Sequence, residues 1–212
     1  MKKIIMLVLA MTVALAMTAC GGGNSGGSSS EETAPQTKTA KVYDGITEST
    51  GIHMDVEMTV SKQTVKMDFQ IKGDKLYADA TVDDQHVIAL DDGEDFYALM
   101  PDTKVGYKTD DDTLGLEDSM EEMADISDDI NKSKCTEGTK EIDGKTYDTE
   151  EFANEDDSAI FCYDGDTLCY IIAKNDSTET QMKVNAIDNK VDESLFKVPS
   201  GYSITDQTKG DD

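Results

Sequence analysis

The chain has 212 residues, of which 45 are acidic and 19 are basic, giving a formal net charge of −26. Every basic residue is lysine, so the chain has no guanidinium group with which to clamp a phosphate. A chain with this charge is repelled by nucleic acid and by anionic lipid headgroups, and we exclude nucleic acid as a partner. The acidic residues are interpreted mainly as a solvated surface.

The N-terminal segment predicts where the protein is held. Met1-Lys2-Lys3 precedes an apolar stretch that ends at Ala19, which is the layout of a signal peptide at 1–19. Residues 17–20 resemble the lipobox of bacterial lipoproteins, which implies that Cys20 becomes a lipidated mature N-terminus carrying diacylglycerol and palmitate. The prediction is a lipid anchor on the extracytoplasmic face of the cell membrane. An ordinary secretory signal that leaves a free thiol is the alternative.

The segment after Cys20 predicts a tether. Residues 21–30 contain only Gly, Ser and Asn, which cannot bury a core. The predicted organisation is a flexible linker over 20–38, a single domain over 39–205 and a disordered tail over 206–212. A short helix is predicted at the start of the domain, over about Thr39–Ser49.

Alternation of apolar and polar residues dominates the chain from 52 to 108. In Ile52–Val60 every second residue is apolar, which is typical of a strand with one buried face. Turns rich in Gly and Asp separate successive segments, as in an antiparallel meander. The strands predicted from this pattern are Ile52–Val60, Val65–Ile71, Leu76–Val82, His86–Leu90, Phe96–Met100 and Lys104–Lys108.

The period then changes to that of a helix. Ser119 and Glu122 match a capping box, and apolar residues recur after Ser119 at helical spacing. These apolar residues are Met120, Met123, Ile126 and Ile130. One amphipathic helix is therefore predicted to interrupt the strands.

Alternation resumes after this helix, and Asp143-Gly144 is a strong hairpin signal. The further predicted strands are Lys134–Ile142, Lys145–Phe152, Ala159–Tyr163, Leu168–Ala173 and Gln181–Ile187. The predicted class is α+β: one large curved antiparallel sheet, an open half-barrel, with one or two helices packed on its concave face.

Three cysteines remain beyond Cys20, and an odd number supports no disulfide framework. Cys162 and Cys169 flank a predicted hairpin. A four-residue loop would place them opposite each other, where a bridge is conceivable, whereas a two-residue turn would misalign them. We interpret Cys135, Cys162 and Cys169 mostly as small buried apolar residues.

The C-terminal sequence from Val191 to Tyr202, with its Leu-Phe pair followed by Pro-x-Gly-Tyr, resembles the end of the LolA-like lipoprotein-localisation superfamily. The hairpin at 161–168 is also similar, and the resemblance covers about residues 40–202. It implies an open half-barrel whose helices form a lid over an apolar cavity that binds acyl chains or lipidated proteins. Soluble members of that superfamily use basic residues, including arginine, at the mouth of the cavity, and this chain has no arginine.

The apolar faces of the predicted strands are rich in methionine, a flexible and polarisable residue that suits variable apolar guests. The residues predicted to line a ligand site are Met54, Val56, Met58, Met67, Phe69, Ile71, Met120, Met123, Ile126, Ile130 and Met182. A core in which these side chains simply fill the space under the helix is the alternative. The predicted function is to bind or carry a lipid or other apolar ligand. The alternative function is an acidic scaffold that docks an envelope protein and binds no ligand.

Residues for chemical catalysis are sparse. The two histidines, His53 and His86, are predicted on the surface and suggest neither a metal cluster nor a nucleophile-histidine pair. An incomplete Ca²⁺-loop pattern begins at Asp110, but Leu114 stands where a side-chain oxygen is needed. We therefore predict no enzymatic activity, no metal site and no cofactor.

Overall fold

The computed structural model describes one large β-sheet with short helical segments, over residues 37–60, 63–82, 85–109, 130, 134–153, 157–175 and 178–208. The helical segments in these ranges are α2 (Lys38–Val42), the 3₁₀ helix η3 (Glu193–Leu195) and Ile130. The strands are β1 (Ile52–Val60), β2 (Gln63–Lys72), β3 (Lys75–Val82), β4 (Gln85–Asp91), β5 (Phe96–Met100), β6 (Val105–Thr109), β7 (Cys135–Ile142), β8 (Lys145–Ala153), β9 (Asp157–Asp164), β10 (Thr167–Asn175), β11 (Thr178–Asp188) and β12 (Ser203–Asp206).

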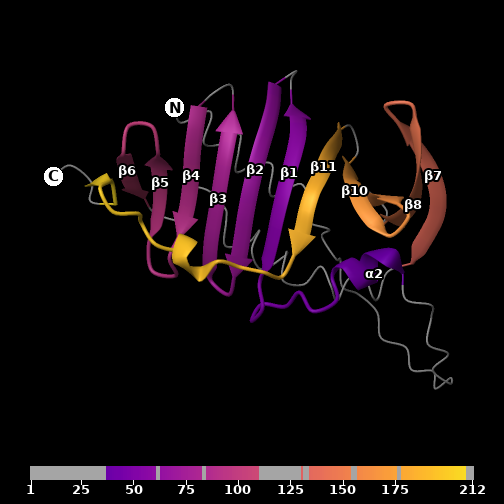
Figure 1. The fold of residues 1–212 in the computed structure, drawn as a ribbon, viewed down its shortest axis with the longest axis horizontal. Helices are drawn as coiled ribbons and strands as arrows, with labels where there is room; N and C mark the ends of the chain where they lie inside the picture. The colour runs from indigo at the N-terminus through magenta and orange to yellow at the C-terminus, as the bar shows by residue number, and fades with distance from the viewer. Residues whose placement is uncertain are drawn as a thin grey trace.

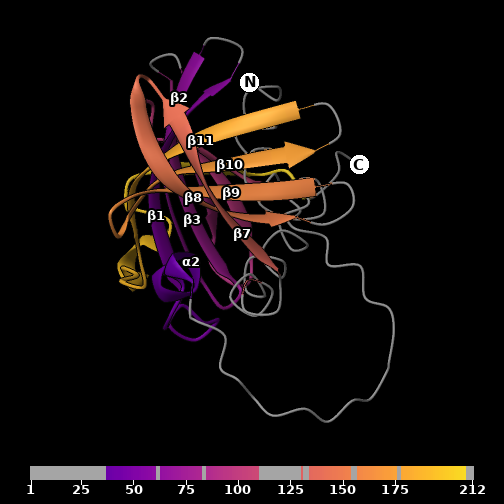
Figure 2. The same cartoon turned by 90° about the vertical axis from the view of Figure 1, so that its right-hand side faces the viewer.

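The strands form one open, mixed sheet in the order β12-β6-β5-β4-β3-β2-β1-β11-β10-β9-β8-β7. Two meanders, β1 to β6 and β7 to β11, join where β1 pairs antiparallel with β11. In Figure 1, β4, β3, β2, β1 and β11 lie side by side, and the next strands of the sheet, β10, β9, β8 and β7, curl away from their plane. Figure 2 shows this curled arm from the side. The prediction of a large curved open sheet is confirmed.

One edge of the sheet contradicts the prediction of wholly antiparallel pairing. β12 pairs with β6 in parallel, with Ile204 opposite Gly106. The sequence pattern missed β12 because this strand has only four residues and all of them are exposed. Without an alternating buried face, a strand has no periodic signal.

One face of the sheet carries a single continuous apolar core, and we call it the inner face. Strands from β1 to β5 and from β8 to β11 contribute buried residues to this core. Apolar residues on the opposite, outer face form two separate smaller clusters, one on β7 to β10 and one on β3 to β5. The inner-face cluster thus runs without a break across neighbouring strands, from β5 through β1 and β11 to β8.

The predicted strands up to β11 coincide with observed strands to within two residues at most ends, because alternation fixes which segments have a buried face. The predicted N-terminal helix is wrong in length, since α2 ends at Val42. Gly45 follows with φ of +81°, a left-handed conformation that no helix contains. The predicted helix at 119–130 lies outside the described residues except for Ile130, which is helical.

The hairpin between β9 and β10 has the shorter of the two loops considered from the sequence. Residues 165 and 166 form its turn, and a register shift between Leu168 and Tyr170 places Tyr170 opposite Cys162. The bulge, and not the length of the loop, therefore takes the two cysteines out of register. Cys135, Cys162 and Cys169 are free thiols. Cys162 is buried as predicted, whereas Cys135 and Cys169 are only partly buried.

Candidate functional site: an apolar inner face

The predicted lining residues of β1, β2 and β11 lie together on the inner face. The register places Met54 opposite Phe69, Val56 opposite Met67, and Met58 opposite Met182. Alternation along each strand directs these side chains to one side of the sheet. The full set of described lining residues is Met54, Val56, Met58, Met67, Phe69, Ile71, Ile130 and Met182, all between 0 and 9 % exposed and all in one cluster.

The remaining predicted lining residues, Met120, Met123 and Ile126, lie outside the described residues, as does the predicted lipid-attachment residue Cys20. Ile130 belongs to the same apolar cluster as Met54 and Met58. Ile130 itself therefore reaches the inner face.

The inner face continues onto β3, β4 and β5 as a floor of small residues, which the sequence analysis did not single out. Ala78 lies opposite Ala89, and Ala89 lies opposite Ala98. Ala80 on β3 and these three form what we call the alanine floor, and all four are buried. Alternation predicts that they point inward, but a small side chain gives no sign of whether the space above it is filled.

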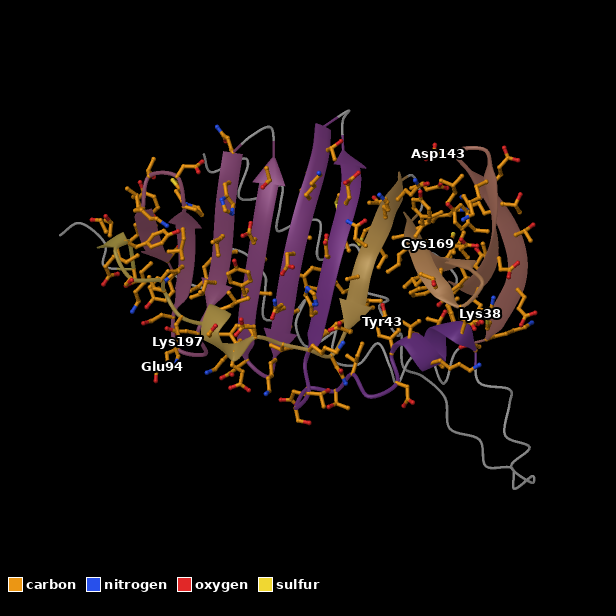
Figure 3. All side chains as sticks on the ribbon, in the orientation of Figure 1. Lys38, Tyr43, Glu94, Asp143, Cys169 and Lys197 are labelled. Atoms are coloured by element: carbon orange, nitrogen blue, oxygen red, sulfur yellow. The ribbon has the colours of Figure 1, made fainter. Side chains whose placement is uncertain are left out.

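Aromatic side chains close the curled end of the inner face. Phe152 of β8 and Phe161 of β9 meet edge to face, with ring centroids 5.7 Å apart. Tyr43, just after α2, meets Phe161 in the same way at 6.2 Å. Figure 3 shows Tyr43 and Lys38 at this end of the molecule, beside the curled arm. Such edge-to-face pairs favour a defined arrangement of the rings.

A buried carboxylate fixes the start of α2 against the sheet. Glu150 is 5 % exposed, and its two oxygens accept hydrogen bonds from the backbone N–H groups of Lys38 and Thr39 at 2.7 Å each. The Thr39 hydroxyl donates to Glu150 at 2.6 Å and lies 2.8 Å from the Tyr163 hydroxyl. Glu150 thus satisfies N–H groups that a helix start leaves unpaired. Burial raises the pKa of Tyr163 well above its usual range, so this hydroxyl stays protonated.

Two thiols on the curled arm are held in the protonated form. Burial raises the pKa of Cys162 to about 11. Burial, followed by the negative charges of Glu150 and Glu137, raises the pKa of Cys135 to about 11. A neutral thiol is a poor nucleophile, and these two cysteines behave as small apolar side chains at neutral pH.

Both histidines lie on the outer face, where each faces an aspartate. His53 Nε2 is 3.1 Å from Asp68 and its Nδ1 is 3.5 Å from Asp188, while His86 Nε2 is 2.7 Å from Asp79. Both rings are partly buried rather than fully exposed. Within the described ranges no group of three or more His, Cys, Asp or Glu side chains has the arrangement of a metal site.

No family model matches the sequence, and no curated protein matches it. A crystal structure of an uncharacterized conserved protein from Thermus thermophilus resembles this chain with a TM-score of 0.45 and 6% identity, covering 80% of this chain and 97% of that one. A structure of PNGF-II resembles it with a TM-score of 0.27 and 8% identity, covering 74% of this chain and 31% of that one. Similarity this low identifies no family.

Among the described residues, no helix has both the length and the apolar character needed to cross a membrane.

Proposed function

We propose that this protein is a lipoprotein, anchored on the extracytoplasmic face of the cell membrane through Cys20, that binds or carries a lipid or another apolar ligand. The ligand would lie on the inner face, in a half-barrel related to the LolA-like superfamily, with α2 and the helix predicted at 119–130 packed over it. The observation that carries the proposal is the combination of a methionine-rich cluster on β1, β2 and β11 with the alanine floor beside it.

The alanine floor supports a ligand site through its size. A half-barrel needs bulky side chains to fill its concave side, and alanine contributes only one methyl group. Ala78, Ala89 and Ala98 lie in the same row of register as Met54 and Phe69, so a ligand bound over them would come closer to the backbone than it could over larger side chains. An acyl chain has the width and apolar character to occupy such a strip, and methionine adapts to its shape.

The test compares two alanine substitutions that add the same volume on opposite faces. Ala89→Leu fills the floor, whereas Ala186→Leu enlarges an alanine of β11 that lies opposite Asp55 on the outer face. Residues 38–212, prepared without detergent, are extracted with solvent for mass spectrometry and titrated with a fluorescent fatty acid. We expect Ala89→Leu, which adds three carbons, to weaken binding about tenfold or more, since a single methylene group already discriminates about tenfold in an apolar pocket.

The two variants also separate this proposal from its rival. The rival is an acidic interaction module with a packed core, and the burial of every described lining residue favours it. If the core is packed, Ala89→Leu lowers the free energy of unfolding by about 1–3 kcal/mol through overpacking. In that case neither the wild type nor Ala186→Leu binds the fatty acid. Repeated failure to extract or titrate any apolar ligand rejects the carrier function.

A further inference from the structure

A recess lies away from the inner face, at one end of the strands. This groove, of about 770 Å³, is bounded by the turn that joins β2 to β3, by the turn at 47–50 and by η3 with the residues that follow it. Figure 1 shows these segments along the same end of the sheet as α2, and Figure 3 shows Lys197 and Lys38 at that end. Its backbone is fixed by a hydrogen bond of 3.0 Å from Gly73 N to the carbonyl of Glu48.

The charge of the groove is opposite to that of the molecule. Lys72, Lys75 and Lys197 line it, against the two carboxylates of Glu48 and Glu193. The whole chain has 45 acidic and 19 basic residues, so a recess with more lysines than carboxylates is a local reversal of sign. At physiological salt the Debye length is about 8 Å, so the three lysines outweigh distant carboxylates in setting the potential inside the groove.

Glu193 already occupies the position of an anion in the groove. Lys72 Nζ forms an ion pair with Glu193 Oε1. Hydrogen bonding and charge from Lys72, followed by the charges of Lys75 and Lys197, hold the pKa of Glu193 below its usual range. The Glu193 side chain is 70 % exposed, so a competing anion can return it to water at little cost.

The groove has an apolar wall as well as lysines. Phe196 is 2 % exposed and lines the recess next to η3. The aliphatic stems of Lys72 and Lys75 add further apolar surface below their ammonium groups. This lining can hold the less polar body of a ligand in addition to its anionic group.

We propose that this lysine groove binds a phosphate group, and that Glu193 occupies the site as an internal counter-ion when no phosphate is bound. A phosphate monoester carries about −1.5 to −2 charges at neutral pH and three acceptor oxygens. A free monocarboxylate carries one negative charge, as Glu193 does. Because Glu193 belongs to the chain, its carboxylate is present in the groove at a high effective concentration, and a free monocarboxylate competes poorly with it. A phosphate can therefore displace Glu193 where a simple carboxylate cannot.

The test follows the reactivity of individual lysines toward an amine-acylating reagent, read by mass spectrometry. The full-length chain in non-ionic detergent is titrated with inorganic phosphate against chloride of equal ionic strength. Phosphate is expected to protect Lys72, Lys75 and Lys197, and to leave Lys190 unprotected. Lys190 is a matched control because its side chain is 85 % exposed and it lies outside the groove.

Variants give the direction of the effect. The double variant Lys75→Gln/Lys197→Gln should weaken phosphate binding by about two- to fivefold for each lysine removed. The affinity is measured from the protection of Lys72 against acylation. Glu193→Gln removes the competitor and should tighten binding severalfold, while Lys190→Gln should leave it unchanged. Equal protection by phosphate and chloride, or a Glu193→Gln variant that binds no better than the wild type, overturns the proposal. Thermal unfolding of each variant checks that the fold is retained.

A second arm identifies the source of the phosphate. The full-length chain is reconstituted in vesicles of phosphatidylcholine alone, or of phosphatidylcholine mixed with phosphatidic acid, whose headgroup is a phosphate monoester. Protection that requires phosphatidic acid assigns the groove to a lipid headgroup, and protection that requires dissolved phosphate assigns it to a soluble phosphate ester. Protection in neither condition rejects the site. None of these outcomes affects the fatty-acid titration that tests the inner face.

Discussion

At the scale of single residues, Glu150 is the buried charge on which the N-terminal part of the domain depends. Its carboxylate is almost fully removed from water, and three donors from Lys38 and Thr39 take the place of that water. Hydrogen bonds to a charged group are stronger than neutral ones, and the loss of one partner leaves the others unpaired. Glu150 therefore connects the point where the described chain begins to a strand more than one hundred residues later.

We expect Glu150→Ala to lower the free energy of unfolding by about 2–3 kcal/mol, because the N–H groups of Lys38 and Thr39 lose their acceptor in a buried place. Urea denaturation followed by circular dichroism measures the change. Glu137→Ala is the control, since Glu137 is exposed on β7. Equal stability of Glu150→Ala and Glu137→Ala would contradict the role assigned to Glu150.

Two thiols with raised pKa values predict how stability depends on alkaline pH. Burial raises the pKa of Cys162 and Cys135 to about 11, from the ordinary thiol value of 9.0. The unfolded chain releases these protons first, so the stabilising contribution is complete below pH 9.0 and is lost as the pH rises toward 11. The free energy of unfolding should therefore fall between about pH 9 and about pH 11.

Urea denaturation at several pH values measures this slope. The double variant Cys135→Ala with Cys162→Ala should show a shallower fall. Some slope should remain, since burial also raises the pKa of Tyr43 and Tyr163 above the usual range. The same slope in the variant and the wild type would mean that these thiols do not contribute.

At the scale of secondary-structure elements, alternation predicted the strands well because most of them have one buried and one solvated face. β1 and β5 were predicted with the observed bounds. The pattern also placed Met54, Met67 and Met182 on one face, since side-chain direction follows from strand parity alone. The pattern could not predict how much space the side chains leave above that face. The alanine floor depends on which strands become neighbours, and that is a property of the fold.

Local chain geometry explains the elements that were predicted less well. α2 ends early because the chain turns at Gly45, and one glycine in a polar segment does not by itself mark the end of a helix. The β9–β10 hairpin has a two-residue turn that alone would keep Cys162 opposite Cys169. The bulge between Leu168 and Tyr170 takes them out of register, and no feature of the sequence signals this bulge. β12 is held by pairing to β6 and has no buried face of its own.

The turn that leads into β1 provides a test at this scale. Gly51 has φ of +83°, and a Cβ there would lie 2.4 Å from the carbonyl oxygen of Ile71. Gly73 also has positive φ, +59°, but a Cβ there would meet nothing within 4 Å. We expect Gly73→Ala to cost about 1 kcal/mol of unfolding free energy from backbone strain alone.

Gly51→Ala should cost about 3 kcal/mol or more, because the backbone of β2 has to move as well. Thermal unfolding of the two variants gives the comparison directly. Similar losses for Gly51→Ala and Gly73→Ala would mean that β2 yields easily at Ile71. A larger loss for Gly51→Ala supports a rigid junction between the turn and the sheet.

At the scale of the whole molecule, the net charge of −26 predicts a stability that increases with salt. Repulsion among carboxylates destabilises the compact state, and the Debye length falls from about 30 Å at 0.01 M salt to about 8 Å at 0.15 M. Screening also weakens lysine–carboxylate pairs, but exposed pairs contribute little. The melting temperature should therefore rise over this range. An unchanged or falling melting temperature would show that the ion pairs outweigh the repulsion.

The pairing of β1 with β11 has a consequence for how the protein is made. Asn185 donates to Asp55 across this junction at 3.1 Å, although 130 residues separate them in the chain. A growing polypeptide can complete the meander from β1 to β6 early, but β1 then presents a bare row of amides and carbonyls until the C-terminal third has been synthesised. Long-range closure of this kind slows folding, and an unpaired strand border invites misassembly with a neighbouring copy. Newly made chains are therefore expected to need shielding until the last long strand arrives.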